Sequence, residues 1–147
     1  MRAVSLFCVA LLAAAPVLAA QAGAAKAVPQ FDAAEKCDQF SQADRHECLT
    51  RMAADSAVTL KQAEAKAIQM INQWFENPNF KNLAKSKLRG SITAFAAYRE
   101  AKCAFHDELV GGGIGNAHDI IRLACIADTN NQRALELIYA TKNLAPP

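Results

Sequence analysis

Four cysteines are spaced in a way that suits disulfide bonds. The chain has 147 residues and five cysteines, of which Cys8 lies in an apolar N-terminal run and the other four follow it: Cys37, Cys48, Cys103 and Cys125. An even number of cysteines in an exported chain favours two disulfides over catalytic or metal-binding thiols. Because neither Cys-x-x-Cys nor His-Glu-x-x-His spacing occurs, we expect no metal site and no cofactor.

Each of the three histidines precedes an acidic residue: His46-Glu47, His106-Asp107 and His118-Asp119. His106 and His118 flank a glycine run and are close enough in sequence to approach one another. A metal ion there would still need further ligands, so solvated surface histidines are the favoured interpretation. No nucleophile lies in a recognisable catalytic turn, and we do not expect an enzyme.

The glycine run Gly111-Gly112-Gly113-Ile114-Gly115 separates His106 from His118. Glycines before a helix can bind phosphate through backbone N–H groups. Here no predicted strand precedes the run, and the Gly-Lys-Ser/Thr ending of a nucleotide-binding loop is missing. We therefore interpret the run as a flexible turn that joins two helices.

The N-terminus predicts an export signal over residues 1–22. Arg2 supplies the positive start, and an apolar run over residues 4–15 leads into small residues. This run is shorter than the roughly 20 residues that a membrane-spanning helix needs, although a retained anchor stays the alternative. Cleavage fits after Ala19 or after Ala22, and we favour Ala22.

Cys8 lies within the predicted signal. It follows two large residues, Leu6 and Phe7, so it does not predict a lipid attachment site and should leave with the signal.

Charge and length narrow the class of protein. Loss of Arg2 leaves 15 basic against 14 acidic side chains, and this near-neutral balance argues against a strongly basic nucleic-acid-binding protein. The length favours one domain, which we place at residues 31–144 after a flexible leader at 23–30.

The mature chain predicts an all-α fold, built as small disulfide-stapled helical hairpins or a bundle. No alternation of period two is long enough for a strand. A short helix is expected near residues 32–39, followed by longer helices at 42–75 and 82–109, the first of which ends at Asn77-Pro78. A third should open at Asn116 and run through Cys125, before a last segment that opens at Asp128-Thr129.

Caps and apolar spacing support these helices. Ser41 with Asp44, and Asn116 with Asp119, have the spacing of N-terminal caps. The first long helix carries an apolar stripe at helical spacing: Leu49, Met52, Ala53, Ala57, Leu60, Ala63, Ala67, Met70, Ile71 and Trp74. Trp74 and Phe75 are predicted to lie in the core. A basic cluster is interpreted as a solvated helix face: Lys81, Lys85, Lys87 and Arg89.

Hairpin geometry favours local disulfides. In an antiparallel hairpin, residues whose numbers have the same sum face one another. Cys103 and Cys125 are centred on residue 114 in the glycine run, and Cys37 with Cys48 are centred beside Ser41. Crossed pairings, such as Cys37–Cys125 with Cys48–Cys103, stay open. Each disulfide is expected to add about 2–4 kcal/mol of stability.

A family resemblance rests on the C-terminal half. Residues 95–103, Phe-Ala-Ala-Tyr-Arg-Glu-Ala-Lys-Cys, give an aromatic residue, then Tyr-Arg-acid, then a cysteine. After the glycine run come three further residues: Cys125, Arg133 and Leu137. This order resembles the LprI-type lysozyme inhibitor family of exported bacterial proteins. In that family two cysteines also precede a long helix, as Cys37 and Cys48 do here.

The resemblance implies a periplasmic or secreted protein that binds a lysozyme-like hydrolase and blocks the hydrolysis of peptidoglycan. Such an inhibitor has to occlude a cleft that contains two carboxylates. A loop held rigid by a disulfide suits that task, and its residues are our candidate contacts: His106, Gly111, Gly112, Gly113, Ile114, Asn116 and His118. The alternative is that the loop only connects two helices.

Two further alternatives stay open. Arg99 and Arg133 serve either in binding or in internal ion pairs, for example with Glu100 or Asp128. The second function considered is a structural envelope protein of the same fold without inhibitory activity. The near-neutral charge predicts little long-range steering toward a basic lysozyme.

Overall fold

The computed structural model describes residues 31–144, which form helices and turns with no strand among them. The four helices are α1 (Ala33–Cys37), α2 (Gln42–Gln73), α3 (Pro78–Glu108) and α4 (Ala117–Thr141). The predicted all-α fold is therefore confirmed. The predicted signal peptide and leader, residues 1–22 and 23–30, lie outside the described residues, and the domain limits stay a prediction. None of these four helices is both long enough and apolar enough to cross a membrane.

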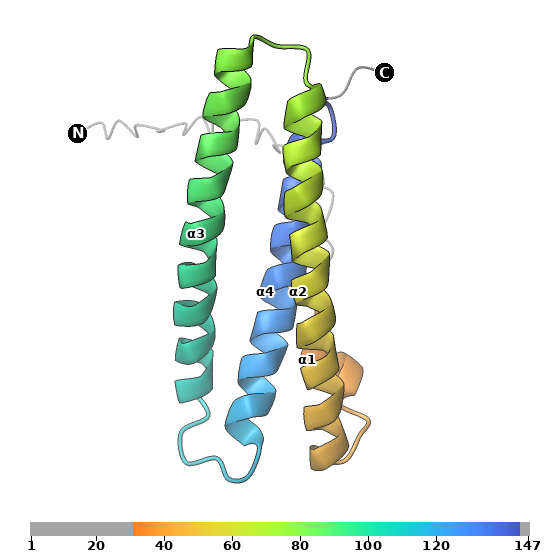
Figure 1. The fold of residues 1–147 in the computed structure, drawn as a ribbon. Helices are drawn as coiled ribbons and strands as arrows, with labels where there is room; N and C mark the ends of the chain where they lie inside the picture. Colours follow the sequence, from red (N-terminus) through yellow and green to blue (C-terminus); the bar gives the residue numbers. More distant parts are fainter. Residues whose placement is uncertain (1–30, 145–147) are drawn as a thin grey trace, which may run out of the picture.

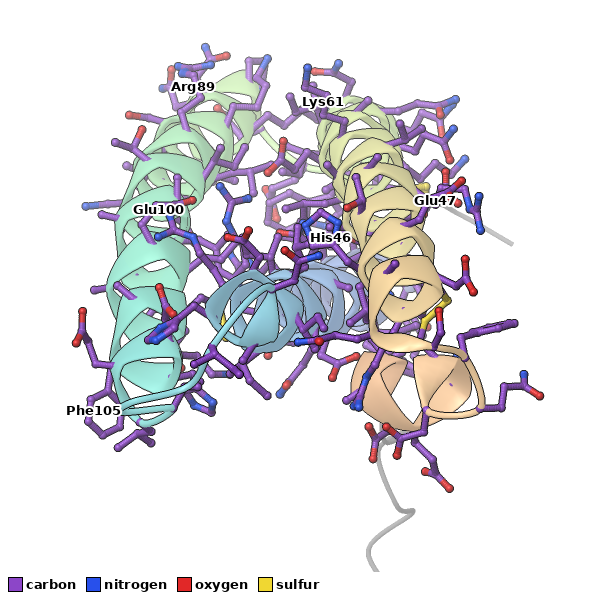
Figure 2. The ribbon with its side chains drawn as sticks, turned by 90° about the horizontal axis from the view of Figure 1, so that it is seen from below. His46, Glu47, Lys61, Arg89, Glu100 and Phe105 are labelled. Carbon is purple, nitrogen blue, oxygen red and sulfur yellow. A yellow bond between two sulfur atoms is a disulfide. The ribbon has the colours of Figure 1, made fainter. Side chains whose placement is uncertain are left out.

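Helix α4 lies between α2 and α3, as both views show (Figure 1, Figure 2). α2 and α4 run in the same direction, and α3 runs antiparallel to both. The short helix α1 packs beside the first turns of α2 and also contacts α4. This topology brings the α1–α2 turn and the α3–α4 loop to one end of the molecule, which we call the loop end (Figure 1).

The core runs along the contact between α2 and α4. A cluster near the loop end combines α1, α2 and α4: Ala33, Cys37, Leu49, Ile120, Ala124 and Ala127. A second cluster lies further along the same two long helices: Leu60, Ala63, Ala67, Ala134 and Leu137. The many alanines allow α2 and α4 to approach closely. By contrast, Cys103 is the one fully buried residue of α3, so this helix is the most loosely attached of the three long ones.

The start of α2 follows the predicted cap. The Ser41 side-chain oxygen accepts a hydrogen bond from the backbone N–H of Asp44 at 3.3 Å, and its hydroxyl donates back to the Asp44 carboxylate at 2.7 Å. These bonds satisfy one backbone donor that the first helical turn leaves unpaired. Burial along α2 matches most of the predicted stripe, except that Ser56 is buried and Ala57 is exposed.

The turn between α2 and α3 differs from the prediction. α2 ends at Gln73, and α3 begins at Pro78 rather than at residue 82. The Asn77 side chain accepts a hydrogen bond from the Asn79 backbone N–H at 2.9 Å, and Pro78 takes the first helical position, where no N–H is needed. The proline therefore starts the second long helix as well as separating it from the first.

Phe75 also departs from its prediction. It lies in this turn with 94% of its surface exposed, whereas Trp74 is half-buried. The core prediction for Phe75 is wrong because α2 stops before it, so helical spacing no longer controls where it points.

Two lysines of the basic cluster stabilise the turn between α2 and α3. Lys81 donates to the Asn72 carbonyl and Lys85 to the Asn72 side chain, each at 3.2 Å.

Helix α4 is continuous from Ala117 to Thr141, so the predicted break at Asp128-Thr129 is wrong. The Asp128 carboxylate accepts a hydrogen bond from the backbone N–H of Ala33 in α1, at 3.0 Å. Thr129 is buried and lies 3.9 Å from the sulfur of Cys125. Asp128 therefore contacts another helix and Thr129 contacts the preceding turn of α4, and neither side chain caps a new helix. Asn116 precedes α4 but makes no side-chain cap bond.

Candidate functional site

Two disulfides fasten the loop end. Cys37 is bonded to Cys48, with Cα atoms 6.1 Å apart, and Cys103 is bonded to Cys125, with Cα atoms 5.5 Å apart. The first ties α1 to α2, and the second ties the end of α3 to α4. The local pairing that the hairpin geometry favoured is therefore confirmed, and the crossed pairing is not formed.

The α3–α4 connection contains the glycine run that we proposed as a contact loop. Gly111 and Gly115 have φ of 61° and 62°, a left-handed conformation that side chains rarely adopt. Between them Ile114 is 84% exposed, and Gln42 of α2 donates to its carbonyl at 3.5 Å. Gly112 faces open space. The loop thus presents an isoleucine to solvent while α2 contacts its backbone.

Gly113 is required by close packing within the loop. A Cβ atom added there would lie 2.4 Å from Cγ1 of Val110 and 3.1 Å from Cβ of Ala117. The first distance is shorter than real Cβ contacts allow, so any side chain would displace a neighbour. The chain is therefore tightly turned at Gly113, although residues 111–116 themselves are exposed.

His118 holds the base of this loop. Its Nδ1 lies 2.6 Å from a carboxylate oxygen of Asp107, and its Nε2 lies 3.2 Å from the carbonyl oxygen of Gly111. Both neighbours can only accept hydrogen bonds, so only the protonated imidazole satisfies both contacts. Consistently, the hydrogen bond to Asp107 raises the pKa of His118 above its usual value of 6.5.

The other two histidines have different surroundings. His106 lines a pocket next to the loop, and His46 of α2 lies 3.7 Å from the Asp119 carboxylate of α4. In Figure 2, His46 is seen on the side of α2 that faces α4. Across residues 31–144, no group of three or more His, Cys, Asp or Glu side chains is placed to hold a metal ion.

Several of the residues that carry the family resemblance attach α3 to its neighbours. Arg99 donates to the side chain of Asn130 at 3.0 Å, and Asn130 donates to Ser56 at the same distance, so one chain of hydrogen bonds crosses three helices. Glu100 accepts from Arg99 and from Arg122, both at 2.9 Å. The predicted Arg99–Glu100 pair is therefore present, whereas Asp128 pairs with neither arginine.

Arg133 has the same structural role further along α4. It bonds to Ser91 of α3 and to Glu136 of α4, and its guanidinium lies 5.6 Å from the ring centre of Phe95. Sequence reasoning missed Asn130, although it lies at helical spacing among apolar residues of α4 and is completely buried. A polar residue on an apolar stripe is the signal that would have identified it.

Sequence reasoning also missed an apolar pocket of about 690 Å³ beside the loop. It lies between the α1–α2 turn, the end of α3 and the first turns of α4. Its walls include Phe40, Arg45, His106, Leu109, Ile120 and Ile121. Among these residues only His106 was a candidate. The pocket was missed because its walls come from three segments that lie far apart in sequence.

Fold and site together define a disulfide-bonded helical domain with an anchored loop at one end. A family model described as "Lysozyme inhibitor LprI" matches residues 33–137, which is most of the chain. The chain therefore belongs to the LprI lysozyme inhibitor family. No curated protein and no solved structure matches it.

Proposed function

We propose that the chain is an exported inhibitor that binds a lysozyme-like peptidoglycan hydrolase and blocks its cleft. The observation that carries this proposal is the family match over residues 33–137, because the matched family is one of lysozyme inhibitors. The predicted signal over residues 1–22 supports export to the periplasm or the medium.

The loop supplies a physical means of inhibition. Ile114 is exposed on a loop whose backbone carbonyls contact His118 and Gln42 and whose turn is tight at Gly113. A loop that is already ordered loses little conformational entropy on binding. An exposed apolar side chain on an ordered loop can act as an anchor in a partner's cleft. We therefore place the contact at residues 111–116, with His106 and His118 behind it.

The near-neutral charge shapes this proposal. With 15 basic and 14 acidic side chains after loss of the signal, long-range attraction to a basic lysozyme is weak. Affinity would then come from short-range fit of the loop, and the rate of association would depend little on ionic strength.

A turbidity assay tests the proposal. Purified protein is titrated into suspensions of bacterial cell walls with several lysozyme types, and inhibition of at least one type is expected. Ile114→Asp should weaken inhibition about tenfold or more, because it puts a carboxylate against the two carboxylates of the cleft. Phe75→Asp is the matched control, since Phe75 is equally exposed but lies at the opposite end of the molecule.

The second candidate function is a structural envelope protein without inhibitory activity. One observation favours it: three motif residues of the family, Arg99, Glu100 and Cys103, serve to attach α3. Those residues would be kept in a protein that retained the fold and lost the inhibition. Failure to inhibit any lysozyme type would support this second function and reject the first.

A further inference from the structure

The end of the molecule opposite the loop end exposes large apolar side chains. Phe75 in the α2–α3 turn is almost fully exposed, and Phe80 and Leu83 in the first turns of α3 are more than half exposed. Tyr139, near the end of α4, is also exposed at this end of the bundle (Figure 1). We call this surface the turn end. Large apolar side chains that gather on one exposed surface mark a contact with a partner.

Basic side chains without acidic partners accompany this apolar surface. Residues 78–93, the first half of α3, carry four basic side chains and no acidic one: Lys81, Lys85, Lys87 and Arg89. None of the four forms an ion pair within residues 31–144. Lys81 and Lys85 donate to the neutral Asn72, and Lys87 and Arg89 are exposed. Their positive charges are therefore available to an external anion.

Little negative charge opposes these cations. The acidic residue of the α2–α3 turn, Glu76, accepts a hydrogen bond from the backbone N–H of Asn77 at 2.8 Å. At the end of α4, Lys142 adds a further exposed cation, whose Nζ lies 5.2 Å from the ring centre of Tyr139. Aromatic rings beside lysines are typical of membrane–water interfaces, where the ring lies at the boundary and the ammonium group reaches the lipid phosphates.

We propose that the turn end docks on an anionic phospholipid bilayer. Phe75, Phe80 and Leu83 enter the boundary between headgroups and acyl chains, and the basic side chains of α3 contact the phosphates. Charge complementarity decides this choice of partner. A soluble polyanion would meet the cations but leave the apolar side chains in water, and a second copy of the chain would bring like charges together. The proposal is independent of lysozyme inhibition, because the glycine loop lies at the other end of the molecule (Figure 1).

Vesicle binding tests the proposal. The purified protein is titrated with vesicles of phosphatidylglycerol and phosphatidylcholine and, in parallel, with vesicles of phosphatidylcholine alone. Trp74 is the only tryptophan of the chain and is half-buried in the turn, so its fluorescence reports on docking there. We expect the anionic vesicles to bind about tenfold more strongly or better, with a blue shift of the Trp74 emission. Salt should weaken this binding, because it screens the charges.

An apolar substitution tests insertion. Phe75→Asp should lower the affinity for anionic vesicles about tenfold, because it replaces an inserted ring by an anion. Ile114→Asp is the matched control, since Ile114 is an equally exposed apolar side chain at the loop end, and it should leave vesicle binding unchanged. Phe75→Asp is expected to keep lysozyme inhibition and Ile114→Asp to weaken it, so the docking proposal and the inhibition proposal can fail separately.

Removal of positive charge tests the contact with the phosphates. The double substitution Lys87→Gln with Arg89→Gln should weaken binding about tenfold or more, because each basic side chain near an anionic surface contributes about fivefold. Lys36→Gln with Arg51→Gln removes the same charge from exposed positions of α1 and the first half of α2, and it should have little effect. Because all four positions are exposed, unfolding curves of both variants should match the parent protein.

Three results would overturn the proposal. The first is no binding to anionic vesicles, or equal binding to anionic and neutral ones. The second is an equal loss of binding in the two double variants, because net charge alone would then explain the attraction. The third is full vesicle binding by Phe75→Asp, which would mean that only the cations are used and that a soluble polyanion, such as polyphosphate, is the better partner.

Discussion

At the scale of single residues, His118 links the loop to the end of α3. Its two ring nitrogens face the Asp107 carboxylate and the Gly111 carbonyl, and only the protonated ring donates to both. When the ring loses a proton, one of these contacts loses its donor. The Gly111 carbonyl is the one released, because the charged carboxylate is the stronger acceptor.

The pH dependence of this contact has a definite sign. The folded pKa of His118 is raised above 6.5, so its stabilising contribution is complete below that value and is lost as pH rises through the folded pKa. The melting temperature of the parent protein should therefore exceed that of His118→Gln most at low pH, and the difference should shrink as pH rises. An NMR titration that places the His118 pKa at or below 6.5 would contradict this.

Asp128 offers a second prediction at this scale. Burial raises the pKa of its carboxyl, while its bond to the Ala33 N–H favours the charged form. Asp128→Asn keeps an oxygen for that N–H and removes the buried charge, so we expect no loss of stability at neutral pH. Asp128→Ala should lose about 1 kcal/mol. Urea unfolding measures both, and an Asn variant as unstable as the Ala variant would reject the argument.

The roles of single residues could be predicted from the sequence only where their partners lie nearby in the chain. Ser41 was identified as an N-terminal cap because its hydrogen-bond partner, Asp44, follows only three residues later. Asp128 has the same local appearance, but its partner, Ala33, is 95 residues away, and no local pattern contains that contact. Arg45 and Leu109 were missed for the same reason, since their pocket exists only after three segments have packed together.

At the scale of elements, the α3–α4 loop depends on Gly113. Gly113→Ala introduces a Cβ that collides with Val110 and crowds Ala117, so the loop has to shift. We expect a loss of about 1–3 kcal/mol and a weaker inhibitor. Gly112→Ala is the matched control, because its Cβ would meet open space. Equal effects of the two substitutions on unfolding and inhibition would argue against a packed loop.

The attachment of α3 depends on the polar contact between three helices. Asn130 is completely buried and bonds to Arg99 and Ser56. Asn130→Ala removes the hydrogen bonds to Arg99 and Ser56 and should lower the free energy of unfolding by about 2 kcal/mol or more. Thermal unfolding checks this loss. Gln132→Ala, at an exposed position of the same helix, should have little effect.

The long helices themselves were largely predictable, because α2 and α4 bury regular stripes. The way in which the helices pack on one another could not be predicted from the sequence. Nothing in the periodicity of α3 showed that it would rest mainly on α4 and bury only Cys103. The continuity of α4 was also not predicted, since Asp128 and Thr129 look like a helix start until their partners, Ala33 and Cys125, are known.

At the scale of the whole molecule, the two disulfides are expected to act differently. Each should contribute about 3 kcal/mol by closing a short loop, of 11 residues for Cys37–Cys48 and 22 for Cys103–Cys125. Replacing Cys103 and Cys125 by alanine should speed hydrogen exchange throughout α3, because that helix has little other burial. Replacing Cys37 and Cys48 should instead affect α1 and the start of α2. Uniform acceleration in both variants would contradict this separation.

The layout of α3 also has a practical consequence. With 31 residues it is about 46 Å long, so the turn around Phe75 lies that far from the glycine loop. A biotin or dye coupled there would stand clear of the loop and the pocket alike. A cysteine introduced at Phe75 would therefore allow the protein to be tethered to a sensor chip with the glycine loop facing the sample.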